Sequence, residues 1–310
     1  LKPFGSRSAL RAGGDAGPGP FRGMAPMKRF EAARLDRDGF WGDPNSSIDW
    51  CERNYVVSFY IAEFWNTMSN VFLTLSGILA FIMARRFGLE RRFQVHGLAW
   101  AFVGLGSTSF HCLLWYSSQL LDELPMIYAA LAWCYCLLQV YDARQALMLR
   151  CGMALYALLW TVLHARGAYT VLFQVQYALL ILAGVGLTEH VLRSITGESL
   201  LGAFGPAPAE RRPGLWMMVR LVRWHVLWLL VAFACWIVDQ AACERLHALP
   251  LNPQLHAWWH VLVGLSVHIG FQYSLAVRLA QQRGKVESMR WVWYLYCIPV
   301  ASEEAMGPTD

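Results

Sequence analysis

The sequence contains few charged residues. Asp, Glu, Lys and Arg make up 15% of its 310 residues, whereas a soluble domain typically carries about 25%. Hydrophobic residues make up 56% of the chain. This shortage of charge disfavours a soluble globular protein and indicates a surface that faces lipid.

The hydrophobic residues also lack the short alternating segments that are typical of a membrane β-barrel. They form long continuous runs, each close to the roughly 20 residues that cross the hydrocarbon core as a helix. Because backbone groups in lipid must be hydrogen-bonded internally, such runs predict a helical bundle. We expect an all-α membrane protein, a seven-transmembrane helix bundle with spans at residues 59–84, 95–115, 120–141, 148–165, 170–192, 219–242 and 256–279.

Basic residues are concentrated in the loops on one side of the predicted membrane. If the first span runs from outside to inside, the loops and tail on the cytosolic side hold most of them, beginning with Arg85 and Arg86. The opposite loops hold only Arg166 and Arg245. Because short basic loops stay in the cytosol, this predicts a lumenal N-terminus and a cytosolic C-terminus. The net charge of +5 does not indicate a nucleic-acid partner, because the sequence contains no recognised binding module.

The sequence divides into three predicted regions. Residues 1–35, rich in Gly, Pro and Ala, are expected to form a disordered N-terminal extension. Residues 36–295 form the membrane domain, in which the loop around 194–214 is a flexible cytosolic link. Residues 296–310 form a C-terminal tail with no assigned role. The chain begins with Leu, so Met24 and Met27 are candidate start residues.

Histidines lie near one end of two predicted helices. His256 and His260 open the last helix in the stretch QLHAWWHVLVG, and their spacing of four places both on one face. His111 lies near the end of the second helix, at the same predicted depth, four residues after Ser107. Intramembrane ionisable groups are costly and mark candidate functional sites.

Three imidazoles and one open position are the ligand set of a catalytic zinc site, at which bound water becomes a nucleophile near pH 7. The alternative is that the paired histidines and their tryptophans belong to an interfacial aromatic belt. The convergence of His111 from a different helix favours zinc. Asp122 and Glu123, at the start of the third helix, and Asp239, near the end of the sixth, add acidic groups at the same depth.

A second polar cluster precedes the first helix. The stretch DWCERN supplies Asp49, Glu52 and Asn54, and Glu63 follows in the first turns of the predicted helix. Oxygen donors of this kind suit calcium, although the spacing is not that of an EF-hand loop. An acidic cap of the helix is the alternative. It explains Glu63 less well, because an unpaired carboxylate in an apolar stretch is costly.

Most of the eight cysteines lie inside predicted helices, where packing explains them. Cys51 and Cys243 instead fall at helix ends on the predicted lumenal side. An oxidising compartment would allow them to pair. Their spacing alone does not decide between a disulfide and two free thiols.

Four stretches in order, DWCERNYVVSFYIAEFWNTMSN, GSTSFH, QLLDELPMIY and QLHAWWHVLVG, resemble the alkaline ceramidases, most of all the type 3 (phytoceramidase) members. The resemblance covers residues 36–295. It implies a multi-pass hydrolase of the endoplasmic reticulum or Golgi membrane. Such an enzyme cleaves the N-acyl bond of a ceramide, phytoceramide or dihydroceramide to a sphingoid base and a free fatty acid. The ceramide lipid would be its substrate, and no obligate protein partner is inferred.

The resemblance also implies roles for individual residues. His111, His256 and His260 would bind Zn²⁺. Asp122 would act as general base on the attacking water, and Ser107 would orient or stabilise the reacting group. The implied Ca²⁺ site consists of Asp49, the Trp50 carbonyl, Glu52, Asn54 and Glu63, and the implied disulfide joins Cys51 to Cys243.

A zinc-containing seven-helix lipid receptor of the adiponectin-receptor type is the rival interpretation, because it looks similar in its serine–histidine and paired-histidine motifs. The DWCERN stretch, the motif around Asp122 and the predicted lumenal N-terminus favour the ceramidase. A transporter is disfavoured, because the polar residues form one layer at one end of the bundle and no path through it.

Overall fold

The computed structural model describes residues 38–138, 142–167, 169–201, 213–283, 288–292 and 296–300. Several predictions fall outside these ranges. They concern the disordered extension of residues 1–35, the candidate starts Met24 and Met27, most of the flexible link, and the last residues of the tail.

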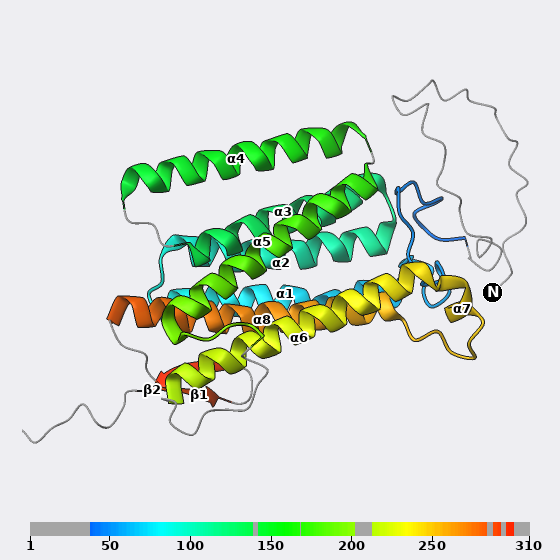
Figure 1. Ribbon diagram of the computed structural model, residues 1–310. Helices are drawn as coiled ribbons and strands as arrows, with labels where there is room; N and C mark the ends of the chain where they lie inside the picture. The colour runs from blue at the N-terminus through cyan, green and yellow to red at the C-terminus, as the bar shows by residue number, and fades with distance from the viewer. Residues whose placement is uncertain are drawn as a thin grey trace, which may run out of the picture.

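Long helices dominate the described chain (Figure 1). They are α1 (Phe64–Arg86), α2 (Arg91–Leu113), α3 (Tyr116–Leu137), α4 (Ala143–Arg166), α5 (Thr170–Thr196), α6 (Pro213–Ala241) and α8 (Leu255–Arg283), with the short α7 (Cys243–His247) between the last two. Each predicted span overlaps one long helix. The structure adds a short antiparallel hairpin of β1 (Ser288–Val292) and β2 (Tyr296–Val300), in which Arg290 is opposite Ile298.

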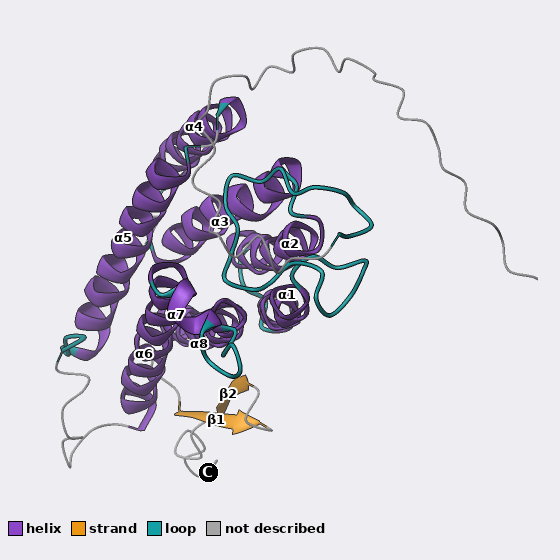
Figure 2. Cartoon of the chain, turned by 90° about the vertical axis from the view of Figure 1, so that its right-hand side faces the viewer, coloured by secondary structure: helices purple, strands orange, loops and turns teal. Residues whose placement is uncertain are grey.

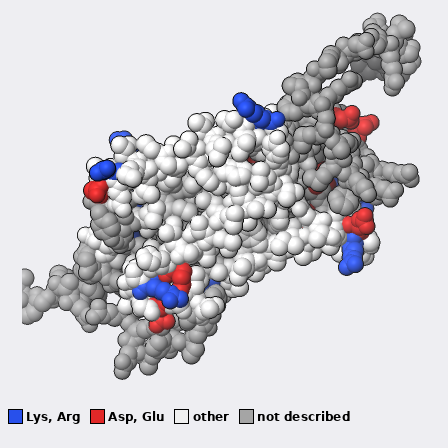
Figure 3. Space-filling view, turned by 45° about the horizontal axis from the view of Figure 1, so that its top comes forward, with Lys and Arg blue, Asp and Glu red and all other residues white. Residues whose placement is uncertain are grey.

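Six of the described helices are long and apolar enough to cross a membrane: α1, α3, α4, α5, α6 and α8. Helix α2 is less apolar because it carries polar residues along its length, from Gln94 and His96 to Ser107 and His111. In Figure 3 the charged side chains lie toward the two ends of the molecule and leave a broad uncharged surface between them. The protein is therefore a multi-pass helical membrane protein.

Glycines bring the central helices into backbone contact. A Cβ added at Gly77 of α1 would lie 2.2 Å from the Ala101 nitrogen of α2, and one at Gly97 would lie 2.5 Å from the Phe81 nitrogen. Small residues at such crossings are typical of membrane helices, which associate through close packing. Helix α4 lies at the edge of the bundle (Figures 1 and 2), and His164 is its one buried residue.

Helix α1 begins at Phe64, five residues later than predicted. The preceding residues form turns and bends, and two of their backbone nitrogens satisfy carbonyl groups at the end of α2. The Ala62 nitrogen donates to the Cys112 carbonyl at 3.0 Å, and the Glu63 nitrogen donates to the His111 carbonyl at 2.9 Å. This pairing fixes the segment that enters α1 against the end of the helix that carries His111.

Candidate metal centre

The three predicted histidines meet at one point inside the bundle. His111 comes from the last turn of α2, and His256 and His260 come from the first turns of α8. All three are buried, and one ring nitrogen from each lies within 4.8 Å of the others. The His111 Nε2 and His256 Nδ1 atoms are buried without a hydrogen-bond partner. Such unsatisfied nitrogens are costly, so a metal ion suits this donor set.

Polar side chains of α1 contact the other ring nitrogens of two of these histidines. Glu63 Oε2 contacts His111 Nδ1, and Ser69 Oγ lies 2.8 Å from His260 Nδ1. Contacts of this kind fix the orientation of a metal-binding imidazole and raise its basicity. Ser69 was not among the residues predicted from the sequence. The signal was present, because Glu63, Asn66 and Ser69 recur at helical spacing at the start of α1.

His256 is held from two sides. The Trp50 ring stacks on its imidazole, with centroids 3.5 Å apart and an interplanar angle of 17°. Its backbone nitrogen donates to Asp239 Oδ1 at 3.1 Å. Asp239 therefore anchors the first turn of α8, a role that the sequence analysis did not foresee when it placed this acid at the same depth as the histidines.

Ser107 and Asp122 face each other across the α2–α3 interface. The Ser107 side chain lies close to the Asp122 carboxyl group. Their contact follows from a glycine, because a Cβ at Gly106 would lie 1.9 Å from the Leu121 carbonyl oxygen. Asp122 lies in the second turn of α3, since this helix begins at Tyr116 rather than at the predicted residue 120.

Glu123 does not share the partners of its neighbour Asp122. Its carboxylate contacts His164 Nε2 at the end of α4 and accepts a hydrogen bond of 3.1 Å from Gln119 Nε2. It therefore ties α3 to α4. His164 itself is buried.

The predicted calcium ligands lie in one neighbourhood, and two of them accept backbone hydrogen bonds. Glu52 accepts hydrogen bonds from the Trp65 and Asn66 nitrogens at 2.7 and 2.8 Å. It thus caps α1, which was the alternative interpretation. Glu63 accepts a bond of 3.1 Å from the Trp50 nitrogen and is hydrogen-bonded to Asp49.

Asn54 completes this neighbourhood, since its Nδ2 atom lies 3.4 and 3.3 Å from the two Asp49 carboxylate oxygens. Burial raises the pKa of Glu52 to about 8, with a further contribution from the charge of Glu63. Burial likewise raises the pKa of Glu63 to about 8. No basic side chain is among the described groups that shift these two pKa values, and a divalent cation would supply a positive counter-charge.

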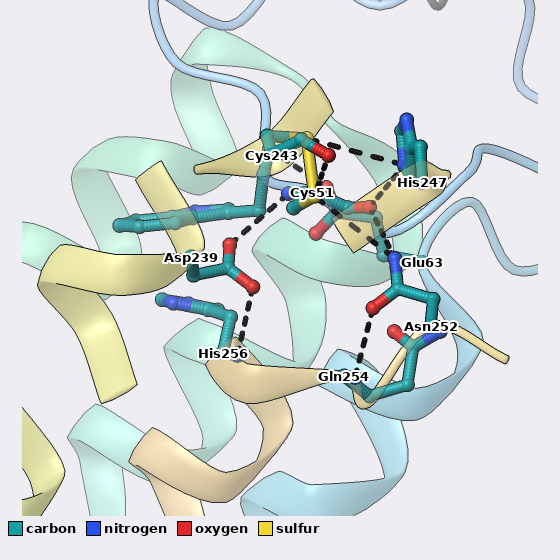
Figure 4. Close-up of a disulfide and its surroundings, with 9 residues drawn as sticks. Cys51, Glu63, Asp239, Cys243, His247, Asn252, Gln254 and His256 are labelled. Carbon is teal, nitrogen blue, oxygen red and sulfur yellow. Dashed lines mark hydrogen bonds between the residues drawn. A yellow bond between two sulfur atoms is a disulfide. The ribbon is translucent and has the colours of Figure 1, made fainter. Parts of the chain in front are cut away.

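A disulfide joins Cys51 to Cys243, with Cα atoms 5.3 Å apart (Figure 4). It links the segment before α1 to α7. The Cys51 nitrogen donates to Asp239 Oδ2 at 3.2 Å, and Asn252 Nδ2 donates to the Cys51 carbonyl at 3.0 Å. Because both sulfurs are bonded to each other, they are not available as thiolate ligands beside His247, although the three side chains lie close together.

The chain is similar to known proteins over most of its length. The family model Ceramidase matches residues 42–302. The chain is 32% identical to alkaline ceramidase 3 of Mus musculus, over 84% of this chain and 96% of the mouse protein. It is 30% identical to an alkaline ceramidase of Arabidopsis thaliana, over 79% of this chain and 88% of the plant protein. An alkaline ceramidase of Saccharomyces cerevisiae is 32% identical, over 74% of this chain and 76% of the yeast protein.

The matched region contains all three histidines, the Ser107–Asp122 pair and both disulfide cysteines. The resemblance to alkaline ceramidases that the four sequence stretches indicated is confirmed, and the chain belongs to the ceramidase family.

Proposed function

We propose that this protein is a zinc-dependent amidase that hydrolyses the N-acyl bond of ceramides inside the membrane. The observation that carries the proposal is the convergence of His111, His256 and His260, buried and with two unsatisfied ring nitrogens. The names of the relatives support ceramide as the substrate class.

His111, His256 and His260 would hold the metal. Zinc bound at three imidazoles lowers the pKa of a water molecule and polarises a carbonyl group. Glu63 and Ser69 would keep two of the rings oriented through their contacts with Nδ1.

Asp122 is the proposed general base. It would accept a proton from the water that attacks the amide carbon, and would then return this proton to the nitrogen of the leaving sphingoid base. Ser107, which lies close to Asp122, would hold the carboxylate in position and donate to the oxygen that becomes negative. Water is consumed, and the products are a free fatty acid and a sphingoid base.

Apolar side chains next to the histidines would hold the lipid chains. A small void of about 30 Å³ between α2, α3, α5, α6 and α8 is lined mainly by apolar side chains such as Trp100, Trp133 and Phe233, and these side chains would have to move apart to admit a lipid chain. Trp259 directly precedes His260 in the sequence and Val263 follows it by three residues, so both lie near His260 on α8 and line this void.

Calcium would bind at Asp49, the Trp50 carbonyl, Glu52, Asn54 and Glu63. The raised pKa values of Glu52 and Glu63 support a cation at this place. Because Glu63 also contacts His111, calcium would stabilise the segment that orients one zinc ligand.

The positions of the basic residues support seven spans with a lumenal N-terminus and a cytosolic C-terminus. The disulfide supports an oxidising compartment on the side of the metal centre. Together these features suit the membrane of the endoplasmic reticulum or Golgi.

The decisive experiment is hydrolysis of a panel of ceramides, dihydroceramides and phytoceramides by the purified protein, with and without a zinc chelator. We expect release of a sphingoid base that the chelator abolishes and added zinc restores. His260→Ala should be inactive, whereas His190→Ala, on α5, should retain activity. A protein that binds zinc but releases no sphingoid base from any substrate would refute the amidase and favour a lipid receptor.

A further inference from the structure

A large cavity lies at the end of the bundle opposite the metal centre. It has a volume of about 880 Å³ and opens between α3 and α4, beside the start of α2 and the end of α8. Its size falls in the range of about 300–1,000 Å³ that is usual for ligand pockets. The histidines lie at the other ends of α2 and α8, so this cavity is separate from the proposed active site.

The polar wall of the cavity is strongly basic. It contains four arginines, Arg91, Arg92, Arg150 and Arg278, and one acidic residue, Glu90. Glu90 contacts Arg278 and lies 4.0 Å from Arg92. One carboxylate against four guanidinium groups leaves an excess of three positive charges in this wall.

The arginines combine fixed and accessible donors. Arg92 donates to the carbonyl groups of Tyr135 and Leu138 at 3.0 and 2.8 Å, which holds it in place. The Nε atom of Arg278 is buried without a hydrogen-bond acceptor. Arg91 and Arg150 are exposed. A phosphate group would supply acceptor oxygens to several of these donors, and guanidinium groups match phosphate geometry well.

The remaining wall is apolar. Leu131 of α3 faces Met153, Ala154 and Ala157 of α4 across the cavity. No residue in the most apolar part of α4 is buried, so the side chains that the structure describes leave space between α3 and α4 unfilled. In a membrane, hydrocarbon chains are the material available to fill it.

We propose that this cavity binds an anionic phospholipid, with its phosphate on the arginines and its acyl chains between α3 and α4. Basic pockets between membrane helices are suited to anionic headgroups. The charge of the site distinguishes its ligand from a neutral ceramide, which has no phosphate to pair with the arginines.

The test compares lipids on the purified, delipidated protein. Titration with phosphatidylinositol or phosphatidylserine, followed by native mass spectrometry and thermal unfolding, should show saturable binding that phosphatidylcholine does not give. Each arginine near an anionic headgroup contributes about a fivefold gain in affinity, so the double variant Arg91→Gln, Arg150→Gln should bind about 25-fold more weakly.

The matched control is the double variant Arg85→Gln, Arg86→Gln, which removes two charges from the same end of the bundle outside the cavity lining. It should bind the anionic lipid like the wild type. A second variant, Ala157→Trp, fills the apolar part of the cavity and leaves every charge in place. It should also lose binding while it elutes as a folded protein.

Three results would overturn the proposal. Phosphatidylcholine could bind as tightly as the anionic lipids, or the control variant could lose as much affinity as the cavity variant. Inorganic phosphate alone could also give the full stabilisation with the same dependence on Arg91 and Arg150, which would identify a soluble phosphate site in place of a lipid site.

Discussion

Glu63, the residue before the first turn of α1, contacts the Nδ1 atom of His111 at the end of α2. Both side chains are fully buried. A carboxylate on the far nitrogen of a metal-binding imidazole orients the ring and strengthens it as a ligand. This contact connects the proposed calcium and zinc sites.

Glu63→Gln should weaken zinc binding, because the amide keeps the shape of the side chain but not its charge. We expect a loss of about 10- to 100-fold in zinc affinity, measured by competition with a chelator at fixed calcium concentration. Glu244→Gln, at an exposed position of α7, is the matched control and should bind zinc normally. Equal zinc affinity in the two variants would contradict the proposed role of Glu63.

Asp122→Asn should remove the proposed general base while leaving the zinc ligands intact. We expect kcat to fall by about 100- to 10,000-fold, with unchanged zinc content by elemental analysis. Ser109→Ala, close to the site on α2, should keep nearly full activity. If Asp122→Asn loses its zinc together with its activity, then Asp122 supports the metal site and is not the base.

Gly106→Ala tests whether the close approach of α2 and α3 is needed for the Ser107–Asp122 contact. The added methyl group would meet the Leu121 carbonyl oxygen, so the helices must move apart at a cost of about 1–3 kcal/mol. We expect a lower unfolding temperature and a lower kcat.

Gly152→Ala is the matched control for this prediction, because its Cβ would have no atom within 4 Å. Alanine favours a helix by about 0.5–1 kcal/mol over glycine, so this variant should be as stable as the wild type or more stable. Similar losses in both glycine variants would show that the α2–α3 contact has no special importance.

The calcium-free protein should lose stability as pH rises from 6 to 9. Burial raises the pKa of Glu52 and Glu63 to about 8, from an ordinary value of 4.5. Between these values the folded state keeps protons that the unfolded state has released, so its stability falls as pH rises toward 8.

Calcium should counteract this loss, because it binds the ionised carboxylates. We expect added calcium to raise the unfolding temperature more at pH 9 than at pH 6, measured by thermal unfolding in calcium and in a calcium chelator. Glu52→Gln should reduce both the pH dependence and the calcium effect. A larger calcium effect at pH 6 would argue against these ligands.

The sequence predicted a helical membrane protein and the convergence of His111, His256 and His260 for a simple physical reason. Lipid forces each span to be a long apolar helix, and polar groups inside such a helix stand out against that background. The i, i+4 spacing of His256 and His260 also fixes their shared face. No comparable rule places the start of α1, so the prediction for this boundary was five residues early.

Contacts between distant segments were decided by the tertiary structure alone. Ser69 and Glu63 reach the histidines because α1 packs between α2 and α8, and Glu123 turns to His164 because α3 lies beside α4. The cavity beside Arg150 exists because α4 remains at the edge of the bundle. Helical periodicity sets which face a residue occupies, but only the packing of the helices determines which side chain that face will meet.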